Sequence, residues 1–438
     1  MRSVVRSRAL LADTRFLSLW LSQGLAQTAQ NALLFTLLVI VLRITGSSVH
    51  TSLLILCFIL PSIPLGFVVG VLLDRVDKTT VLVATSLLRA GACALFFFFH
   101  QDEWSIYAIS IGVATAGLFF NPAVVSMIPT LVPRERLVPA NSLYNFTLTA
   151  SQLVGIVFIA PTLLKLVGAD GLFVTTGLLF VAAAASATRV RGPIVPDNRS
   201  PATIGTIHTE FRESFRALTS DRYSVLALSQ LIVSSTLVLL FAILIPRYMQ
   251  DVIDVPADNA ALVFAPTGIG AIVGLRFLPW FARYGKNRTV VIGLVGIAVC
   301  LALLALVEPI AEVWETGPDE LDPSRLLKVS LLQALVMSFA GPMGFFYALL
   351  NAPAQTILHE RAPPEMRGRI FATQVVSANF ISLLPLLLVG VTTDLLDIAP
   401  VLLLLSLVIG GVAVASIMIG GAELPEREEE RLPQEAHT

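Results

Sequence analysis

Residues 50–99 contain two long apolar stretches, HTSLLILCFILPSIPLGFVVGVLL (50–73) and TTVLVATSLLRAGACALFFFF (79–99), separated by DRVDK (74–78). A helix needs about 20 apolar residues to cross ~30 Å of hydrocarbon, and each stretch is long enough. Four of the five residues between them are charged, and charged groups are costly inside a bilayer. The pattern therefore predicts two membrane-spanning helices joined by a short charged turn.

The same pattern continues along the whole chain. The apolar runs lie near 16–42, 50–73, 79–99, 104–128, 137–166, 170–188, 223–249, 260–281, 289–307, 328–358, 368–392 and 398–420. We expect helices, because an open sheet in lipid would leave backbone groups unpaired. The runs also lack the alternating polarity of a β-barrel. The predicted fold is an all-α membrane protein with twelve transmembrane helices.

The composition supports a membrane protein and excludes several other classes. The chain is 55% hydrophobic and 13% charged, whereas soluble domains carry roughly 25% charged residues. Its net charge of -1 provides no basic surface for nucleic acid. The first apolar run extends to Leu42, too far for a cleaved signal peptide, so we interpret it as an uncleaved span. Three cysteines inside apolar runs, five scattered histidines and the lack of a phosphate-binding loop predict no metal, no cofactor and no ATP hydrolysis.

The distribution of lysine and arginine predicts the orientation. If the N-terminus is cytoplasmic, the cytoplasmic segments hold 22 of the 29 basic residues and the outer loops hold 5. Cytoplasmic loops carry the excess of basic residues in membrane proteins. We therefore expect a multi-pass protein of the cell membrane, with both termini in the cytoplasm.

The chain divides into two similar halves. The predicted parts are an N-terminal six-helix bundle (1–188), a cytoplasmic linker (189–222), a C-terminal six-helix bundle (223–422) and a charged tail (423–438). Pro122, Pro133 and Arg136 recur 231 residues later as Pro353, Pro364 and Arg367. Such repeats indicate two pseudo-symmetric bundles with a site between them near the bilayer midplane. Since both halves are present, we expect the chain to work as a monomer.

At this point the sequence resembles the major facilitator superfamily. The segment Gly70-Val-Leu-Leu-Asp74-Arg75-Val-Asp77-Lys78 resembles its signature loop between the second and third spans. Residues 121–143, 364–372 and 390–397 are similar to the drug and siderophore exporter subgroup, which includes macrolide-efflux and enterobactin-exporter proteins. The resemblance implies alternating access by two rocking bundles. It also implies a cytoplasmic gate formed by Gly70, Asp74, Arg75 and Lys78, with Arg367 and Gly368 as the matching element of the second half.

Five positions depart from that resemblance. The signature usually has glycine at Asp77 and a basic residue at Thr79. The subgroup often has Gly-Asp where this chain has Ala29-Gln30, which removes a proton carrier from the first span. It often has Gly-Pro where this chain has Gly155-Ile156, which weakens the motif support for export.

Polar stripes along four spans are the candidates for substrate contact. Unpaired amides in hydrocarbon are costly, so these side chains either line a cavity or form interhelical hydrogen bonds. The candidates are Gln23, Gln27, Gln30 and Asn31 in the first span, Asn145 and Gln152 in the fifth, Gln230 in the seventh and Asn351 in the tenth.

Two arginines lie within predicted spans. Arg89 falls near the middle of the third span, where an arginine costs about 2.5–3.5 kcal/mol on insertion scales. It either faces the cavity and attracts an anionic group or supports the gate loop. Arg276 lies near the cytoplasmic end of the eighth span and can extend toward water. The glycines Gly268, Gly270 and Gly274 predict close helix packing, because their spacing does not fit a dinucleotide-binding loop.

These observations predict a secondary transporter that exports small amphipathic molecules of the drug or siderophore type. The alternative is a lysophospholipid or other lipid flippase of the same fold. An enzyme is disfavoured because the chain has no His-Glu-x-x-His motif and no cluster of aspartate or histidine. Since the spans hold almost no carboxylates, proton coupling, coupling to another ion and facilitated flux all stay open.

Overall fold

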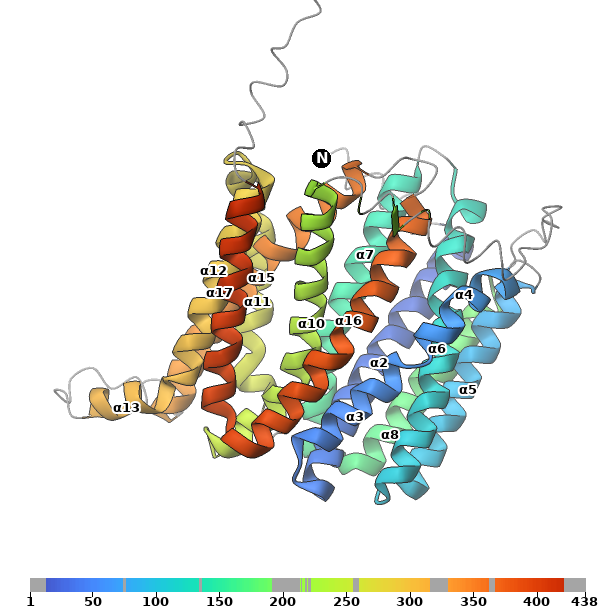
Figure 1. The fold of residues 1–438 in the computed structure, drawn as a ribbon. Helices are drawn as coiled ribbons and strands as arrows, with labels where there is room; N and C mark the ends of the chain where they lie inside the picture. The colour runs from blue at the N-terminus through green and yellow to red at the C-terminus, as the bar shows by residue number, and fades with distance from the viewer. Residues whose placement is uncertain are drawn as a thin grey trace, which may run out of the picture. The chain divides into compact units, whose positions relative to one another are not determined.

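The computed structural model describes residues 13–73, 76–133, 136–190, 222–254, 260–315, 330–361 and 367–420, together with positions 213, 215, 216 and 219. Every regular element in these ranges is a helix (Figure 1). The helices form two compact units, the first containing α2 to α8 and the second α10 to α17. Most of the predicted linker and the whole predicted tail fall outside the described residues.

The first unit contains the first six predicted spans. Pro61 separates the two helices of the second span, because proline cannot donate a backbone hydrogen bond within a helix. The elements are α2 (Thr14–Thr45), α3 (Ser48–Ile59), α4 (Ser62–Leu73), α5 (Lys78–Phe99), α6 (Glu103–Leu131), α7 (Leu137–Leu153), the π-helix η2 (Val154–Ile159) and α8 (Ala160–Ala187).

A chain reversal at Gly168 divides α8 between the fifth and sixth spans. Its backbone is left-handed, with φ 70° and ψ -172°, a conformation that glycine adopts without steric cost. Before this residue, the chain runs parallel to α2. Thr147 of α7 contacts Trp20 of α2, and further along both segments Gly155 of η2 contacts Thr28. After Gly168 the chain runs antiparallel to α5: Phe173 stacks on Phe96, and further along α8 the Phe180 ring faces Arg89.

The second unit contains the remaining six predicted spans and one short helix that the sequence reading missed. Its elements are α10 (Arg222–Asp251), α11 (Ala260–Ala282), α12 (Lys286–Ala305), α13 (Val307–Glu315), α15 (Leu331–Arg361), α16 (Arg367–Leu396) and α17 (Ile398–Gly420). Eleven helices in the described residues are long and apolar enough to cross a membrane. The reversal at Gly168 accounts for the twelfth, so the predicted number of spans agrees with the structure.

The short helix α13 lies where the sequence predicted only an acidic outer loop. It is amphipathic: Glu308 and Glu312 are acidic, whereas Val313 and Trp314 are exposed apolar side chains. Figure 1 shows α13 running across the direction of α12. Its 9 residues are too few to span a bilayer, which is why a search for long apolar runs misses it.

Glycines bring α11, α12 and α15 into backbone contact. A Cβ atom added at Gly270 would lie 1.8 Å from the carbonyl oxygen of Gly341, and one at Gly344 would lie 1.9 Å from that of Thr267. On α12, a Cβ at Gly293 would lie 2.6 Å from the amide nitrogen of Leu350. Small residues let membrane helices approach closely, so the structure confirms the predicted packing role of the α11 glycines.

Candidate functional site

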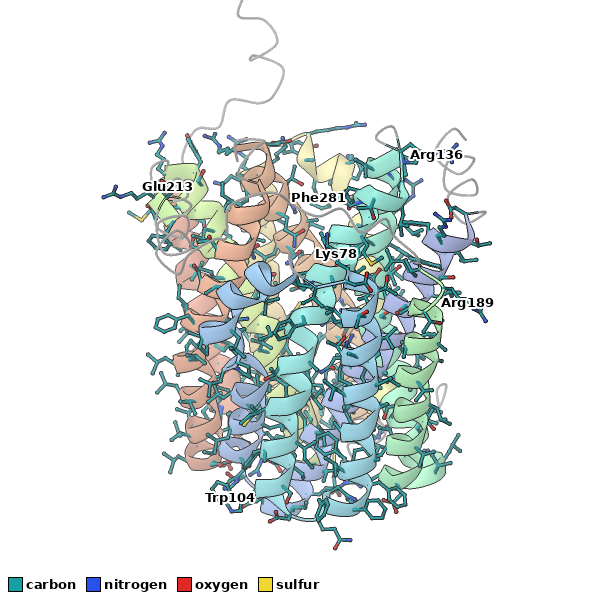
Figure 2. All side chains as sticks on the ribbon, turned by 90° about the vertical axis from the view of Figure 1, so that its right-hand side faces the viewer. Lys78, Trp104, Arg136, Arg189, Glu213 and Phe281 are labelled. Carbon is teal, nitrogen blue, oxygen red and sulfur yellow. The ribbon has the colours of Figure 1, made fainter. Side chains whose placement is uncertain are left out.

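The two ends of the first unit differ in the side chains that they carry. Figure 2 shows Lys78, Arg136 and Arg189 toward one end of the unit and Trp104 at the opposite end. At the basic end, the Thr79 hydroxyl donates a hydrogen bond to the Val190 carbonyl at 2.6 Å, which joins the start of α5 to the end of α8. The basic end is the one that carries the predicted gate loop.

The residues around the predicted gate are only partly described. Asp74 and Arg75 lie outside the described residues, as do the side chains of Arg367 and Gly368. Gly70 lies in the last turn of α4, Lys78 begins α5 and is half-buried, and Arg367 begins α16.

Asp77 and Thr79, two departures from the superfamily signature, both have structural roles. The carboxylate of Asp77 accepts hydrogen bonds from the amide (2.9 Å) and the hydroxyl (2.8 Å) of Thr80, which caps the N-terminus of α5. Thr79 makes the bond to Val190 already described. This chain therefore stabilises the loop through local hydrogen bonds at the two positions that depart from the signature.

The polar stripe of the first span begins with Gln23, which is buried where α2 packs against α7 and is hydrogen-bonded to it. The indole of Trp20 donates to the hydroxyl of Thr147, and the Gln23 amide donates to the Tyr144 carbonyl at 3.3 Å. Gln23 is only 2% exposed. The structure therefore gives Gln23 an interhelical hydrogen bond, the alternative to a cavity wall that the polar stripe left open.

The other residues of this stripe remain partly accessible. Gln27, Gln30 and Asn31 are half-buried, and the Asn31 amide donates to the Gln27 carbonyl at 2.8 Å. The buried Oε1 atom of Gln30 has no hydrogen-bond partner among the described residues. Because an unpaired buried amide oxygen is costly, Gln30 is suited to accept a hydrogen bond from a bound molecule.

The π-helix η2 packs against this part of α2. A Cβ atom at Gly155 would lie 2.7 Å from the Thr28 carbonyl oxygen and 2.8 Å from Asn31 Cβ. Gln152, in the last turn of α7, is half-buried, whereas the Asn145 side chain lies outside the described residues. The π-bulges found inside helices often occur at functional sites, and this one packs directly against Asn31.

In the second unit, α10 and α15 hold a separate polar cluster. The Asn351 amide donates to the Ser234 hydroxyl at 2.8 Å and lies 3.4 Å from the Tyr347 hydroxyl. Asn351 and Tyr347 are half-buried, and Ser234 is fully buried. Asn351 is thus the candidate of the second unit with the best access to a bound molecule.

Gln230 lies on the same helix as Ser234 but belongs to a different environment. Its amide donates to Asn287 Oδ1 at 3.1 Å and to the Ser416 hydroxyl at 3.3 Å, which ties α10 to α12 and α17. The side chain is 0% exposed. For Gln230 the structure therefore favours the interhelical hydrogen bond over the cavity wall.

Arg89 is sealed inside the first unit. Its guanidinium lies 4.5 Å from the ring centre of Phe120 and 5.1 Å from that of Phe180. The Nε atom donates to the Thr85 carbonyl at 3.2 Å, and the residue is 1% exposed. Cation–π contacts replace part of the lost hydration. This burial favours the structural alternative for Arg89 over substrate contact.

Sequence reasoning missed a cluster of titratable side chains on α3 and α6. The Nδ1 atom of His50 lies 2.9 Å from the Tyr107 hydroxyl and 3.2 Å from Glu103 Oε2. A neutral Nδ1 accepts a bond from the tyrosine, whereas a protonated Nδ1 donates to the carboxylate. The spacing of Glu103 and Tyr107, one turn apart on one helix, was visible in the sequence; their proximity to His50 was not.

The neighbouring Asp102 belongs to a different hydrogen-bonding group. The Ser105 hydroxyl and amide both donate to its carboxylate, which lowers the pKa of Asp102 and caps α6. Among the described residues, there is no group of three or more histidine, cysteine, aspartate or glutamate side chains suited to a metal ion.

Comparison with known proteins places this arrangement among transporters. The sequence model of the Major Facilitator Superfamily matches residues 19–384. Similar curated proteins include macrolide efflux protein A of Streptococcus pyogenes, 22% identical over 79% of this chain and 91% of the relative. The multidrug efflux pump Tap of Mycolicibacterium fortuitum is 23% identical over 86% and 89%, and the putative bacilysin exporter BacE of Bacillus subtilis is 23% identical over 72% and 74%.

Solved structures confirm the predicted fold. The nucleoside transporter NupG aligns with a TM-score of 0.69 at 12% identity, over 93% of this chain and 99% of the other. The POT family transporter PepTSo also aligns with a TM-score of 0.69, at 13% identity, over 96% and 99%. The likeness establishes the twelve-helix, two-bundle architecture for this sequence.

Proposed function

Because this chain belongs to the Major Facilitator Superfamily, we propose that it is a secondary transporter that exports small amphipathic molecules by alternating access. The observation that carries the proposal is the similarity to macrolide, multidrug and bacilysin efflux proteins over most of their lengths. In this proposal the transporter lies in the cell membrane as a monomer, with both termini in the cytoplasm. The excess of basic residues on the predicted cytoplasmic segments supports that orientation.

We propose that the accessible amides of both units contact the substrate. In the first unit these are Gln27, Gln30 and Asn31, and in the second unit Asn351 with its neighbour Tyr347. Their partial exposure and the unpaired oxygen of Gln30 support this role. Amides accept and donate hydrogen bonds without a fixed charge, which suits a pathway for chemically varied amphipathic molecules.

A matched pair of variants tests this assignment in the second unit. Asn351→Ala is expected to weaken substrate binding about tenfold, since a hydrogen bond of ~1.4 kcal/mol is lost while the fold is retained. Gln230→Ala is expected to lower thermal stability instead, because it removes the bonds to Asn287 and Ser416. Substrate titration and thermal unfolding of both purified proteins separate the two effects. Unchanged affinity in Asn351→Ala would remove this residue from the pathway.

A ligand thermal-shift panel on the detergent-purified protein tests the function itself. Specific ligands stabilise the folded state by mass action. The panel contains macrolides, hydrophobic cations, catecholate siderophores and lysophospholipids. Stabilisation by a drug or siderophore, followed by its flux in proteoliposomes, is the expected result. Stabilisation by lysophospholipids alone would replace the exporter with the lipid flippase, and binding without flux would contradict transport.

We propose that protons drive export and that the His50, Glu103 and Tyr107 cluster binds them. The same nitrogen of His50 faces a hydroxyl donor and a carboxylate acceptor, which supports a group that changes partners on protonation. Cys57 on α3 is a further ionisable group beside Tyr107. Arg43 lies in the last turn of α2, the helix packed against α3. No carboxylate lies deeper in the described spans of the first unit.

Glu103→Gln is expected to reduce flux driven by a pH gradient at least about tenfold, since the amide cannot stabilise a protonated His50 as the carboxylate does. Exchange of labelled for unlabelled substrate without a gradient is expected to continue. Asp102→Asn is the matched control, because that carboxylate is bound to Ser105. Both fluxes are measured in proteoliposomes with a compound that the panel identifies. Normal gradient-driven flux in Glu103→Gln would show that coupling lies elsewhere.

A further inference from the structure

A pocket of about 660 Å³ lies beside the last turns of α11. Arginine and aromatic side chains form its walls: Arg276, Phe277, Trp280, Phe281, Arg283 and, from α15, Phe345. Its volume falls in the range of pockets that hold whole small molecules. All of these residues belong to the second unit, and Figure 2 shows Phe281 toward the end of that unit that carries Glu213.

Two arginines give the pocket a positive charge that no described carboxylate neutralises. Arg276 lies in α11 and Arg283 in the turn directly after it, a seven-residue separation that corresponds to about 10 Å along the helix axis. In the described part of the chain neither guanidinium has an ion-pair partner, and no carboxylate lines the pocket. The nearby Lys286, by contrast, is paired with Glu360 at 2.8 Å. The pocket is therefore complementary to an anion.

A continuous series of aromatic rings covers one wall. Trp280 stacks edge-to-face on Tyr284 (5.5 Å between ring centres) and on Phe281 (4.8 Å), and Phe281 contacts Phe345 (5.9 Å). Phe277 and Trp280 are each 50% exposed. Tryptophan and tyrosine concentrate where headgroups meet hydrocarbon, because one part of each ring is apolar and the other polar. The wall thus offers apolar surface next to two cations, with the aromatic composition typical of the headgroup region.

We propose that this pocket binds an anionic phospholipid of the adjacent leaflet, with its phosphate between Arg276 and Arg283 and its acyl chains against Phe277 and Phe345. A lipid fits better than a soluble anion, because the two arginines lie at different depths and the exposed rings need apolar cover. A headgroup also neutralises Arg276, which is costly inside a span when unpaired. In the orientation proposed above this leaflet is the cytoplasmic one, whose anionic lipids attract basic sites.

Thermal unfolding in mixed micelles tests the proposal. We expect phosphatidylglycerol to raise the unfolding temperature of the wild-type protein by roughly 3 °C more than phosphatidylcholine does. This difference is expected to vanish in the double variant Arg276→Gln, Arg283→Gln. It should persist in Arg189→Gln, which removes an exposed arginine of the first unit. An equal phosphatidylglycerol effect in the double variant would overturn the proposal, as would equal stabilisation by glycerol phosphate.

A second measurement does not depend on the arginine variants folding. In a protein with Trp20, Trp104 and Trp314 replaced by phenylalanine, Trp280 is the remaining tryptophan. Dibrominated phosphatidylglycerol is expected to quench its fluorescence more strongly than dibrominated phosphatidylcholine. Equal quenching by the two lipids would contradict an anionic lipid at this wall. Neither measurement involves transport, so both are independent of the proposed export function.

Discussion

Gly270→Ala is expected to lower the free energy of unfolding by about 3 kcal/mol, at the upper end of the range for overpacked positions. The added Cβ would lie 1.8 Å from the Gly341 carbonyl oxygen, far inside van der Waals contact. The obstacle is backbone, so no side-chain rotation relieves it. The two helices must separate, and the neighbouring contact of Gly344 with Thr267 is lost with them. Denaturant or thermal unfolding of the purified variant measures the change.

Gly411→Ala is the control, since it is the same substitution in α17 of the same unit and its Cβ meets nothing within 4 Å. Alanine is the better helix former, so this variant is expected to be neutral or slightly more stable. If Gly270→Ala proves as stable as Gly411→Ala, the backbone contact between α11 and α15 is wrong. If both variants are destabilised alike, the loss is not due to packing at position 270.

The second large effect is expected at Gly155, where stability and transport are both affected. In Gly155→Val the branched side chain would overlap the Thr28 carbonyl and Asn31 Cβ, which a Cβ alone already approaches to 2.7 and 2.8 Å. We expect unfolding to become easier by about 3 kcal/mol. Because Asn31 belongs to the proposed substrate pathway, we also expect transport by the folded fraction to fall. Flux per folded molecule separates this effect from lost protein.

Gly112→Val provides the matched change on α6, where a Cβ meets nothing within 4 Å. It makes the same change in helix propensity, which favours valine slightly over glycine, but causes no steric overlap. Transport and stability close to those of the wild type are expected there. Normal flux and stability in Gly155→Val would show that η2 does not hold α2 in the described position.

The positions of the spans could be predicted from the sequence because hydrophobic length is a local property. The twelve apolar runs needed no knowledge of their neighbours, and the structure has helices at each. The packing role of Gly270 and Gly274 could be predicted as well, since a small residue in a span favours a close helix contact. Their partner, α15, could not be named, because one sequence does not state which helices are adjacent.

The site was harder to predict, because residues of the same type have different roles depending on which helices lie next to them. Gln230 and Ser234 lie one turn apart on α10, yet the first bonds to α12 and α17 and the second to α15. Gln23 and Gln27 likewise belong to one stripe, but only Gln23 is sealed against α7. The cluster around His50 joins α3 and α6, and the sequence does not indicate that these two helices are in contact. Amide stripes therefore identify the polar residues of a span but not which of them are accessible.

The reversal at Gly168 has a consequence for how this protein is made. A single left-handed residue connects the fifth and sixth spans, which run in opposite directions. No loop therefore separates the insertion of the fifth span from that of the sixth. We expect the two to enter the bilayer during synthesis as a preassembled hairpin. A ribosome that has just added residue 168 has therefore made only the first helix of this hairpin.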